Sequence, residues 1–216
     1  RWRRGTGEAV PLDQFIPVAE QSGLIVDLGA WVLRTALAAQ RELADHGHSL
    51  RMAVNVSPVQ FRHPGFLRVV RAAIAEAAID ARLLELEITE SVALFGWAQT
   101  VERMRAIKAL GTSIAIDDFG TGFSSLSYIA RLPTDCLKID RSFVAALGNR
   151  HSGTPIAELV VQLGRQLGMR VLAEGVENAL QLDTLRGLGC HEGQGMVFAP
   201  PMEQHDLLVW LRGRKP

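Results

Sequence analysis

The chain has 216 residues, is 48% hydrophobic, and carries 23 basic and 23 acidic side chains, so its formal net charge is zero. This length suits one large domain and lies within the range of an α/β barrel. The balanced charge argues against a protein that holds duplex nucleic acid by its phosphates, because such proteins need a basic surplus. Charged residues interrupt each apolar run before the roughly 20 positions of a membrane-spanning helix, so we expect no membrane segment in this chain.

The cysteines and histidines do not predict a disulfide or a zinc site. Cys136 and Cys190 lack ligand spacing and are interpreted as buried, reduced thiols. His46 and His48 flank Gly47, where a helix should end, so they are expected in a surface turn. With no recognisable signal peptide, we expect a cytoplasmic chain, either as a whole protein or as the cytoplasmic module of a larger, membrane-anchored one.

Six short apolar runs, each followed by a helix-like segment, predict the strands of a parallel sheet and hence an α/β fold. Glycines stand where helices should stop before the next strand, at Gly47, Gly111, Gly168 and Gly189. In chain order the predicted strands are Arg51 to Ser57, Leu83 to Thr89, Ser113 to Asp117, Cys136 to Asp140, Arg170 to Glu174, and Gly195 to Phe198.

Helix starts and apolar stripes fill the segments between these strands. Thr154 followed by Pro155 predicts one helix start, and Asn178 with Gln181 resembles a capping box. Two apolar stripes at helical spacing predict packing on the sheet. They are Leu28, Trp31, Val32, Thr35, Ala36, Ala39 and Leu43 on an early helix, and Leu159, Leu163 and Leu167 on a later one.

The strands place charged residues on one face of the sheet. Because successive side chains of a strand point to opposite faces, one polar set faces inward: Asn55, Glu85, Glu87, Asp117, Lys138, Asp140 and Glu174. Most of these lie at the C-terminal ends of strands, where barrel enzymes place their chemistry. Any single charge is equally compatible with a structural ion pair, such as Lys138 with Asp140. Five acids around one lysine, however, repel each other unless divalent cations compensate them, and their oxygens suit Mg²⁺ or Mn²⁺.

The adjacent acids Asp117 and Asp118 leave the third predicted strand and enter a glycine-rich loop that runs to Leu126. Adjacent carboxylates at a strand end can bridge two metal ions, as in-line phosphoryl displacement often requires. A kinase is excluded as an explanation of this Asp-Phe-Gly string, because the HRD loop and the preceding glycine-rich phosphate loop are missing.

Taken together, the ordered motifs resemble the EAL family of cyclic di-GMP phosphodiesterases. They are Val54-Asn55-Val56-Ser57, Leu86-Glu87-Ile88-Thr89-Glu90-Ser91, Asp117 to Leu126, Leu137-Lys138-Ile139-Asp140-Arg141-Ser142-Phe143, Ala173-Glu174-Gly175-Val176-Glu177 and Gln194-Gly195. The segment from Arg1 to Glu20 resembles the stretch after the namesake Glu-Ala-Leu tripeptide, which would lie immediately before Arg1. The resemblance implies a TIM-type (β/α)8 barrel that lacks its first strand or two here, as a single domain over residues 1–216 of a longer protein.

The resemblance also implies residue roles. Two Mg²⁺ or Mn²⁺ ions would be held by Asn55, Glu87, Asp117, Asp118 and Glu174, together with the glutamate of the Glu-Ala-Leu tripeptide. Glu174 would alternatively act as general base, and Lys138 would position the attacking water and stabilise charge on the phosphate. The substrate pocket would be lined by Arg1, Asp140, Glu177 and Gln194. Glu90 would anchor the loop after Asp118, unless it only caps the next helix, and Arg1 is equally compatible with a disordered terminus.

The implied activity is metal-dependent hydrolysis of cyclic di-GMP to linear 5′-pGpG by in-line attack of water at a two-metal site. One alternative is an inactive receptor domain that binds cyclic di-GMP, and another is an unrelated barrel enzyme with a carboxylate metal site. Retention of each acid that can be checked favours the phosphodiesterase. The resemblance further implies a homodimer and a sensory or diguanylate cyclase domain upstream.

Overall fold

The computed structural model describes residues 2–3, 5, 7–94, 96–121, 126–147 and 154–213. Within these ranges, six parallel strands form the main sheet, and their spatial order is also their order in the chain. They are β3 (Met52–Val56), β4 (Leu84–Thr89), β5 (Ser113–Phe119), β6 (Cys136–Ile139), β7 (Arg170–Ala173) and β8 (Glu192–Gly193). A small antiparallel pair, β1 (Trp2–Arg3) and β2 (Ala9–Val10), precedes them.

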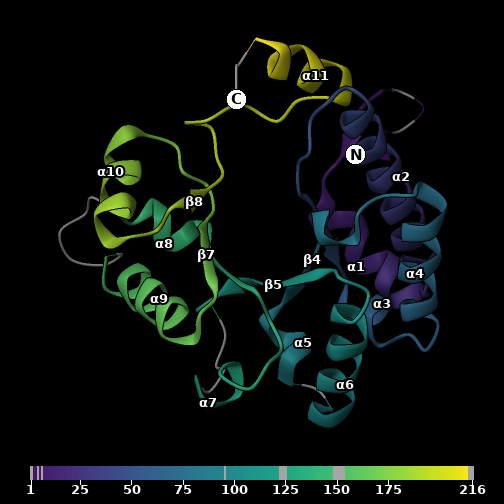
Figure 1. Cartoon of the computed structure of the whole chain (residues 1–216), viewed down its shortest axis with the longest axis horizontal. Helices are drawn as coiled ribbons and strands as arrows, with labels where there is room; N and C mark the ends of the chain where they lie inside the picture. The colour runs from purple at the N-terminus through teal and green to yellow at the C-terminus, as the bar shows by residue number, and fades with distance from the viewer. Residues whose placement is uncertain are drawn as a thin grey trace.

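Helices connect the strands and run outside the arc that the strands trace (Figure 1). In Figure 1, α2 and α4 lie outside one end of the arc, and α9 and α10 lie outside the other. An arc of parallel strands with outer helices is part of a (β/α)8 barrel, so the predicted fold class is confirmed. The helices are α1 (Leu12–Ser22), α2 (Ile25–Asp45), α3 (Pro58–Arg62), α4 (Phe66–Ala77), η1 (Ala81–Leu83), α5 (Glu90–Leu94), α6 (Trp97–Lys108), α7 (Leu126–Ile129), α8 (Arg141–Ala145), α9 (Thr154–Leu167), α10 (Ala179–Leu188) and α11 (Gln204–Arg212).

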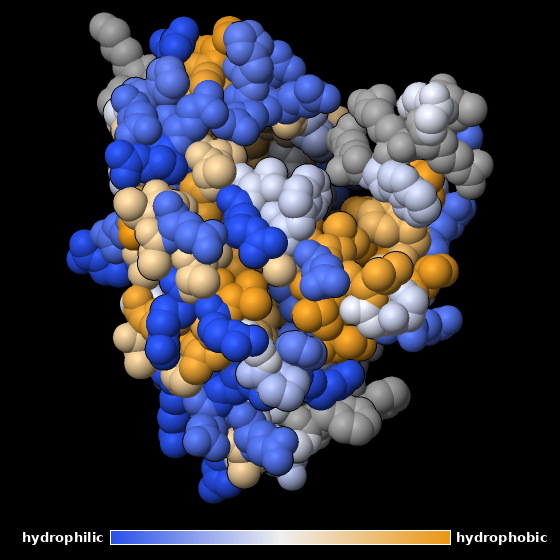
Figure 2. Space-filling model, turned by 90° about the vertical axis from the view of Figure 1, so that its right-hand side faces the viewer, coloured by the Kyte–Doolittle hydropathy of each residue, from blue (hydrophilic) through white to orange (hydrophobic). Residues whose placement is uncertain are grey.

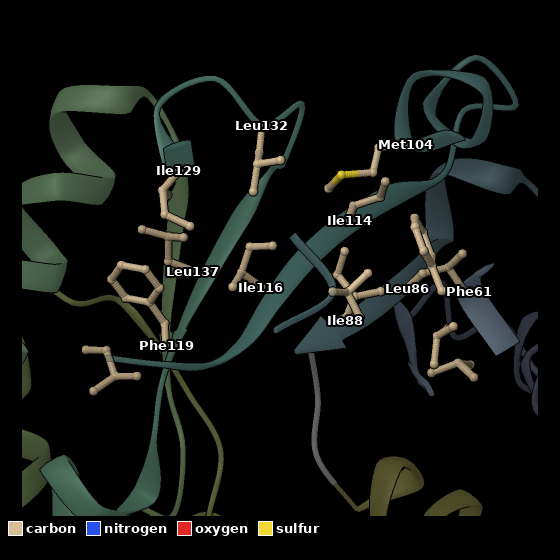
Figure 3. Close-up of a cluster of buried hydrophobic side chains, with 14 of the residues drawn as sticks. Phe61, Leu86, Ile88, Met104, Ile114, Ile116, Phe119, Ile129, Leu132 and Leu137 are labelled. Carbon is tan, nitrogen blue, oxygen red and sulfur yellow. The ribbon is translucent and has the colours of Figure 1, made fainter. Parts of the chain in front are cut away.

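The hydrophobic core lies between the outward face of the sheet and the helices. Strand residues of one parity, such as Leu86, Ile116 and Leu137, are almost completely buried, as the alternation predicts. Figure 3 shows Leu137 beside Ile129 of α7 and Ile114 beside Met104 of α6, within one buried cluster. The opposite parity therefore points into the concave side of the arc, where the charged residues lie.

The prediction for the sixth strand was wrong in position. The strand is β8 (Glu192–Gly193), whereas residues 195–198 form a turn. Gly195 has a φ of 152°, and the N–H of Phe198 donates a hydrogen bond to the carbonyl of Gly195. The end of β8 thus places Gln194 at the same rim of the sheet as Glu174, because the N–H of Gln194 donates to the carbonyl of Ala173.

The predicted stripe on α2 was wrong for Trp31, Val32 and Thr35, which are exposed, whereas Leu43 is buried and Ala36 packs against the core. The buried face of this helix instead consists of Ile25, Gly29, Ala30, Leu33, Leu37, Gln40 and Leu43. Trp31 and Val32 line a groove of about 920 Å³ together with residues of α1 such as Phe15 and Val18. Figure 2, which faces the side carrying α2 and α4, shows apolar side chains gathered between charged ones.

On α9, Leu159 is 52% exposed, and Val160 and Val161 are buried in its place.

The predicted helix boundaries are confirmed. Gly47, Gly111, Gly168 and Gly189 all have positive φ at helix ends, where a side chain would be strained. Asn178 and Gln181 form a reciprocal capping box at the start of α10. None of the described helices combines the length and apolar composition that crossing a bilayer demands.

Gly195 gives a direct test of the turn after β8. A Cβ at this position would lie 2.3 Å from the backbone N and O atoms of Val176, and the φ of 152° disfavours any side chain. We expect Gly195→Ala to cost about 1–3 kcal/mol of folding free energy and to lower Tm by several degrees. The control is Gly187→Ala in α10, where a Cβ meets nothing within 4 Å and should not destabilise the helix. Equal Tm values for the two variants would contradict this account.

Candidate functional site

A β-bulge in β5 brings two adjacent acids to one side of the sheet. β5 pairs with β6 at Ile116↔Leu137 and again at Phe119↔Ile139, so Asp117 and Asp118 together oppose only Lys138. Asp118 has a φ of 53°, which is uncommon for a residue other than glycine. Because the bulge interrupts the strand alternation, carboxylate oxygens of Asp117, Asp118 and Glu174 lie within 4.8 Å of one another. Carboxylate oxygens at this spacing suit a hard divalent cation.

Lys138 lies at the centre of the acids and is only 2% exposed. Its Nζ atom lies 2.8 Å from Glu87 Oε1, 2.9 Å from Asp117 Oδ1 and 2.5 Å from Glu174 Oε1. These three acids come from β4, β5 and the end of β7, and they match the three N–H donors of one ammonium group. The alternative pair of Lys138 with Asp140 is not formed, because Asp140 instead caps α8 by accepting hydrogen bonds from Ser142.

Two opposing effects set the pKa values of the site: burial of the charged groups, and the ion pairs between Lys138 and the acids. Burial alone would lower the pKa of Lys138, but its hydrogen bonds to Glu174 and Glu87 outweigh that effect and raise it. Burial raises the pKa of Glu87 and of Glu174 above the ordinary glutamate value, and Lys138 offsets only part of this. Burial and the charges of Asp117 and Asp140 likewise raise the pKa of Asp118. One lysine therefore does not neutralise the whole acidic set.

Residues of the neighbouring strands extend the site. Asn55 pairs in register with Glu87 across β3 and β4, and it is exposed on the concave side. Gln194 Nε2 donates to Glu174 Oε1 at 2.7 Å. Glu177 is exposed just before α10, with its backbone N–H donating to Gln181. Arg1 lies outside the described residues.

Glu90 begins α5 and is buried, and its Oε2 accepts a hydrogen bond from the Gly120 N–H at 3.2 Å. This contact connects α5 to the segment that follows Asp118. Two supporting residues were not predicted, namely Ser142, which orients Asp140, and Arg170, which lies beneath the site. Both carried a signal, because Ser142 completes an Asp-x-Ser cap and Arg170 shares the parity of Glu174.

Both cysteines are buried and free, as predicted, and burial raises the pKa of Cys136 to about 12. His46 follows the end of α2 and its ring Nδ1 contacts the carbonyl of Glu42, which agrees with a surface turn.

Replacement of Lys138 tests whether its ammonium holds the acids together. Lys138→Met leaves Glu87, Asp117 and Glu174 close together without their shared cation, so we expect a loss of about 3–5 kcal/mol of unfolding free energy in metal-free buffer. Chemical denaturation followed by circular dichroism measures this loss. The control is Lys108→Met, whose partner Asp135 is partly exposed and whose loss should cost roughly 1 kcal/mol. Similar losses for both variants would contradict the central position of Lys138.

Comparison with known proteins agrees with this geometry. The family model described as the EAL domain matches residues 1–201. Among curated proteins of Pseudomonas aeruginosa, the chain is 40% identical to the bifunctional diguanylate cyclase/cyclic di-GMP phosphodiesterase MucR and 39% identical to the cyclic di-GMP phosphodiesterase NbdA. These alignments cover 97% and 98% of the chain but only 31% and 27% of the relatives.

A solved structure of the MucR phosphodiesterase in complex with cyclic di-GMP has a similar fold. It superposes with a TM-score of 0.92 at 40% identity, covering 96% of this chain and 84% of that one. Because the family model matches nearly the whole chain and the relatives align over almost all of it, the chain belongs to the EAL domain family.

Proposed function

We propose that this chain hydrolyses cyclic di-GMP to linear 5′-pGpG with two bound Mg²⁺ or Mn²⁺ ions. The observation that carries the proposal is the convergence of Asp117, Asp118 and Glu174 oxygens beside the buried ammonium of Lys138. The names of the relatives MucR and NbdA, and the cyclic di-GMP in the MucR structure, support this substrate. A receptor that only binds the dinucleotide has no need of so concentrated an acidic set.

The ions would be held by Asp117, Asp118 and Glu174, with Glu87 and Asn55 completing the oxygen donors. When bound, such ions make water a stronger nucleophile and neutralise the departing 3′ oxygen of the substrate. Asp117 would contribute to both metal positions, since the bulge sets its carboxylate beside that of Asp118.

Glu174 is held for proton transfer or ligation by two donors. Lys138 and Gln194 both donate to its Oε1 atom. These two contacts restrict the rotation of the carboxylate group. The raised pKa of Glu174 favours its use as a general base.

Lys138 would stabilise the phosphate. Its ammonium is buried and already oriented, so its attraction for a developing negative charge costs little reorganisation. From this position its positive charge would attract a phosphate oxygen or the attacking water. Asp140, Glu177 and Gln194, together with Arg1, would line the pocket that holds the guanine nucleotides.

We further propose that residues 1–216 are one EAL-type barrel domain of a longer cytoplasmic or membrane-anchored protein. The small share of the relatives that the chain spans supports this proposal. A diguanylate cyclase or sensory domain upstream and a homodimeric state complete the proposal, and the bifunctional name of MucR supports a cyclase neighbour.

Turnover by the purified chain tests the activity. With Mg²⁺ or Mn²⁺, we expect cyclic di-GMP to be converted to pGpG, measured by reverse-phase chromatography, and a chelator should stop the reaction. Asp117→Asn and Glu174→Gln should each lower kcat more than about 100-fold, because direct ligands matter more than outer-shell groups, whose loss costs roughly 10- to 100-fold. Asp183→Asn and Glu102→Gln are exposed controls that should keep full activity.

Binding of cyclic di-GMP without any product over long incubation would favour the receptor instead. Normal kcat in both Asp117→Asn and Glu174→Gln would remove the assigned roles while leaving the family membership untouched.

The contact of Glu90 with Gly120 predicts a link between α5 and metal binding. Glu90→Ala should raise the Mn²⁺ concentration for half-maximal activity by roughly ten-fold, because the segment after Asp118 loses its anchor. Activity titrated against Mn²⁺ measures the shift, and Glu102→Ala on the exposed face of α6 is the matched control. An unchanged Mn²⁺ requirement would reduce Glu90 to a helix-starting residue.

A further inference from the structure

A second layer of charged side chains lies beneath the carboxylate cluster. On β4, Glu85 lies two residues before Glu87 on the same face, and at the start of β7, Arg170 shares the parity of Glu174. Arg170 Nη1 lies 2.7 Å from Glu192 Oε2, and Arg170 Nη2 contacts Glu85 Oε2. Arg51, just before β3, lies 3.6 Å from Glu192 Oε2. The four residues Arg51, Glu85, Arg170 and Glu192 are called the floor cluster.

The floor cluster joins strands that are not neighbours. β5 and β6 lie between β4 and β7 in the sheet, so the contact of Arg170 with Glu85 crosses the concave side of the arc. Lys138 makes a similar crossing one layer above, since it contacts Glu87 of β4 and Glu174 at the end of β7. Two crossings at different depths restrict the curvature of the sheet, and this curvature sets the separation of Glu87 and Glu174.

The two layers differ in charge. Within the floor cluster two arginines balance two glutamates, so the cluster adds no net charge beneath the site. In the upper layer one lysine faces three acids, so acidic groups outnumber basic ones there. The crossing in the floor therefore does not depend on a bound cation, whereas the crossing through Lys138 lies among the proposed ligands.

We propose that Arg170 is a positioning residue for the carboxylate site: by bridging Glu85 and Glu192 it holds β4 and β7 at the separation that the ligands require. The inference rests on the proposed function of that site. The forked guanidinium contacts two acids at once through different nitrogens, which a lysine ammonium does not reproduce with the same fixed geometry. Arg170 takes no part in the chemistry, because it lies at the opposite end of its strand from Glu174.

The test compares Arg170→Met and Arg170→Lys with the unaltered chain, using Mn²⁺ titration calorimetry and steady-state kinetics. We expect Arg170→Met to weaken Mn²⁺ binding by about ten-fold or more and to lower kcat, with KM for cyclic di-GMP little changed. Arg170→Lys should fall between the two. Arg82→Met is the matched control, because Arg82 is exposed and pairs with its near neighbour Asp80, so this variant should bind Mn²⁺ normally.

A double variant keeps the test valid if Arg170→Met fails to fold because Glu85 is left buried without its partner. Glu85→Met/Arg170→Met replaces the ion pair by apolar side chains and should fold. It should still bind Mn²⁺ more weakly, because the crossing is lost. Mn²⁺ affinity equal to that of the unaltered chain, in the double variant or in a folded Arg170→Met, would overturn the proposal.

The readouts separate this inference from the proposed function. If the unaltered chain binds Mn²⁺ but does not cleave cyclic di-GMP, the proposed reaction fails, and the comparison of Mn²⁺ affinities still decides the role of Arg170. If the unaltered chain binds no Mn²⁺, there is no site to position and both proposals are overturned.

Discussion

The structure depends on one buried ammonium group that three strands share. Lys138 is almost completely removed from solvent, and this placement is tolerable only because each of its N–H donors meets a carboxylate. Glu87, Asp117 and Glu174 would in turn repel one another without it. The ion pairs across the concave side therefore link β4, β5, β6 and the end of β7, and they keep the acids of the site close together.

The backbone of β5 brings Asp118 to the same side of the sheet as Asp117, which the ion pairs of Lys138 do not do. An unbroken strand would turn Asp118 away from Asp117, to the other face of the sheet. The bulge opposite Lys138 and the left-handed conformation of Asp118 bring both carboxylates to the same side. Strained backbone conformations often occur at functional sites. Here the strained residue, Asp118, is also one of the three acids whose carboxylate oxygens lie close together.

The sequence predicted the fold class and the inward set well, because strand alternation and helix-ending glycines are local properties of the chain. It did not predict the bulge, since no residue type between Ile116 and Phe119 reveals that two residues oppose one. Part of the α2 stripe failed because apolar residues occur on more than one face of this helix, so Trp31 and Val32 were chosen in place of the buried Leu33 and Leu37, and the buried Gln40 is polar. Gln40 is stable there because its amide donates to the carbonyls of Leu50 and Leu83.

Residue roles depended on contacts between distant strands, which a pattern in one strand does not contain. Parity placed Glu85 inward, but only the fold reveals that Arg170 reaches it across β5 and β6.

The most direct test of the central claim is anomalous X-ray diffraction from crystals of the chain grown with Mn²⁺. The account predicts anomalous density beside Asp117, Asp118 and Glu174, with these carboxylates as ligands. Well-ordered crystals with Mn²⁺ bound only elsewhere, or with none beside these residues, would contradict it.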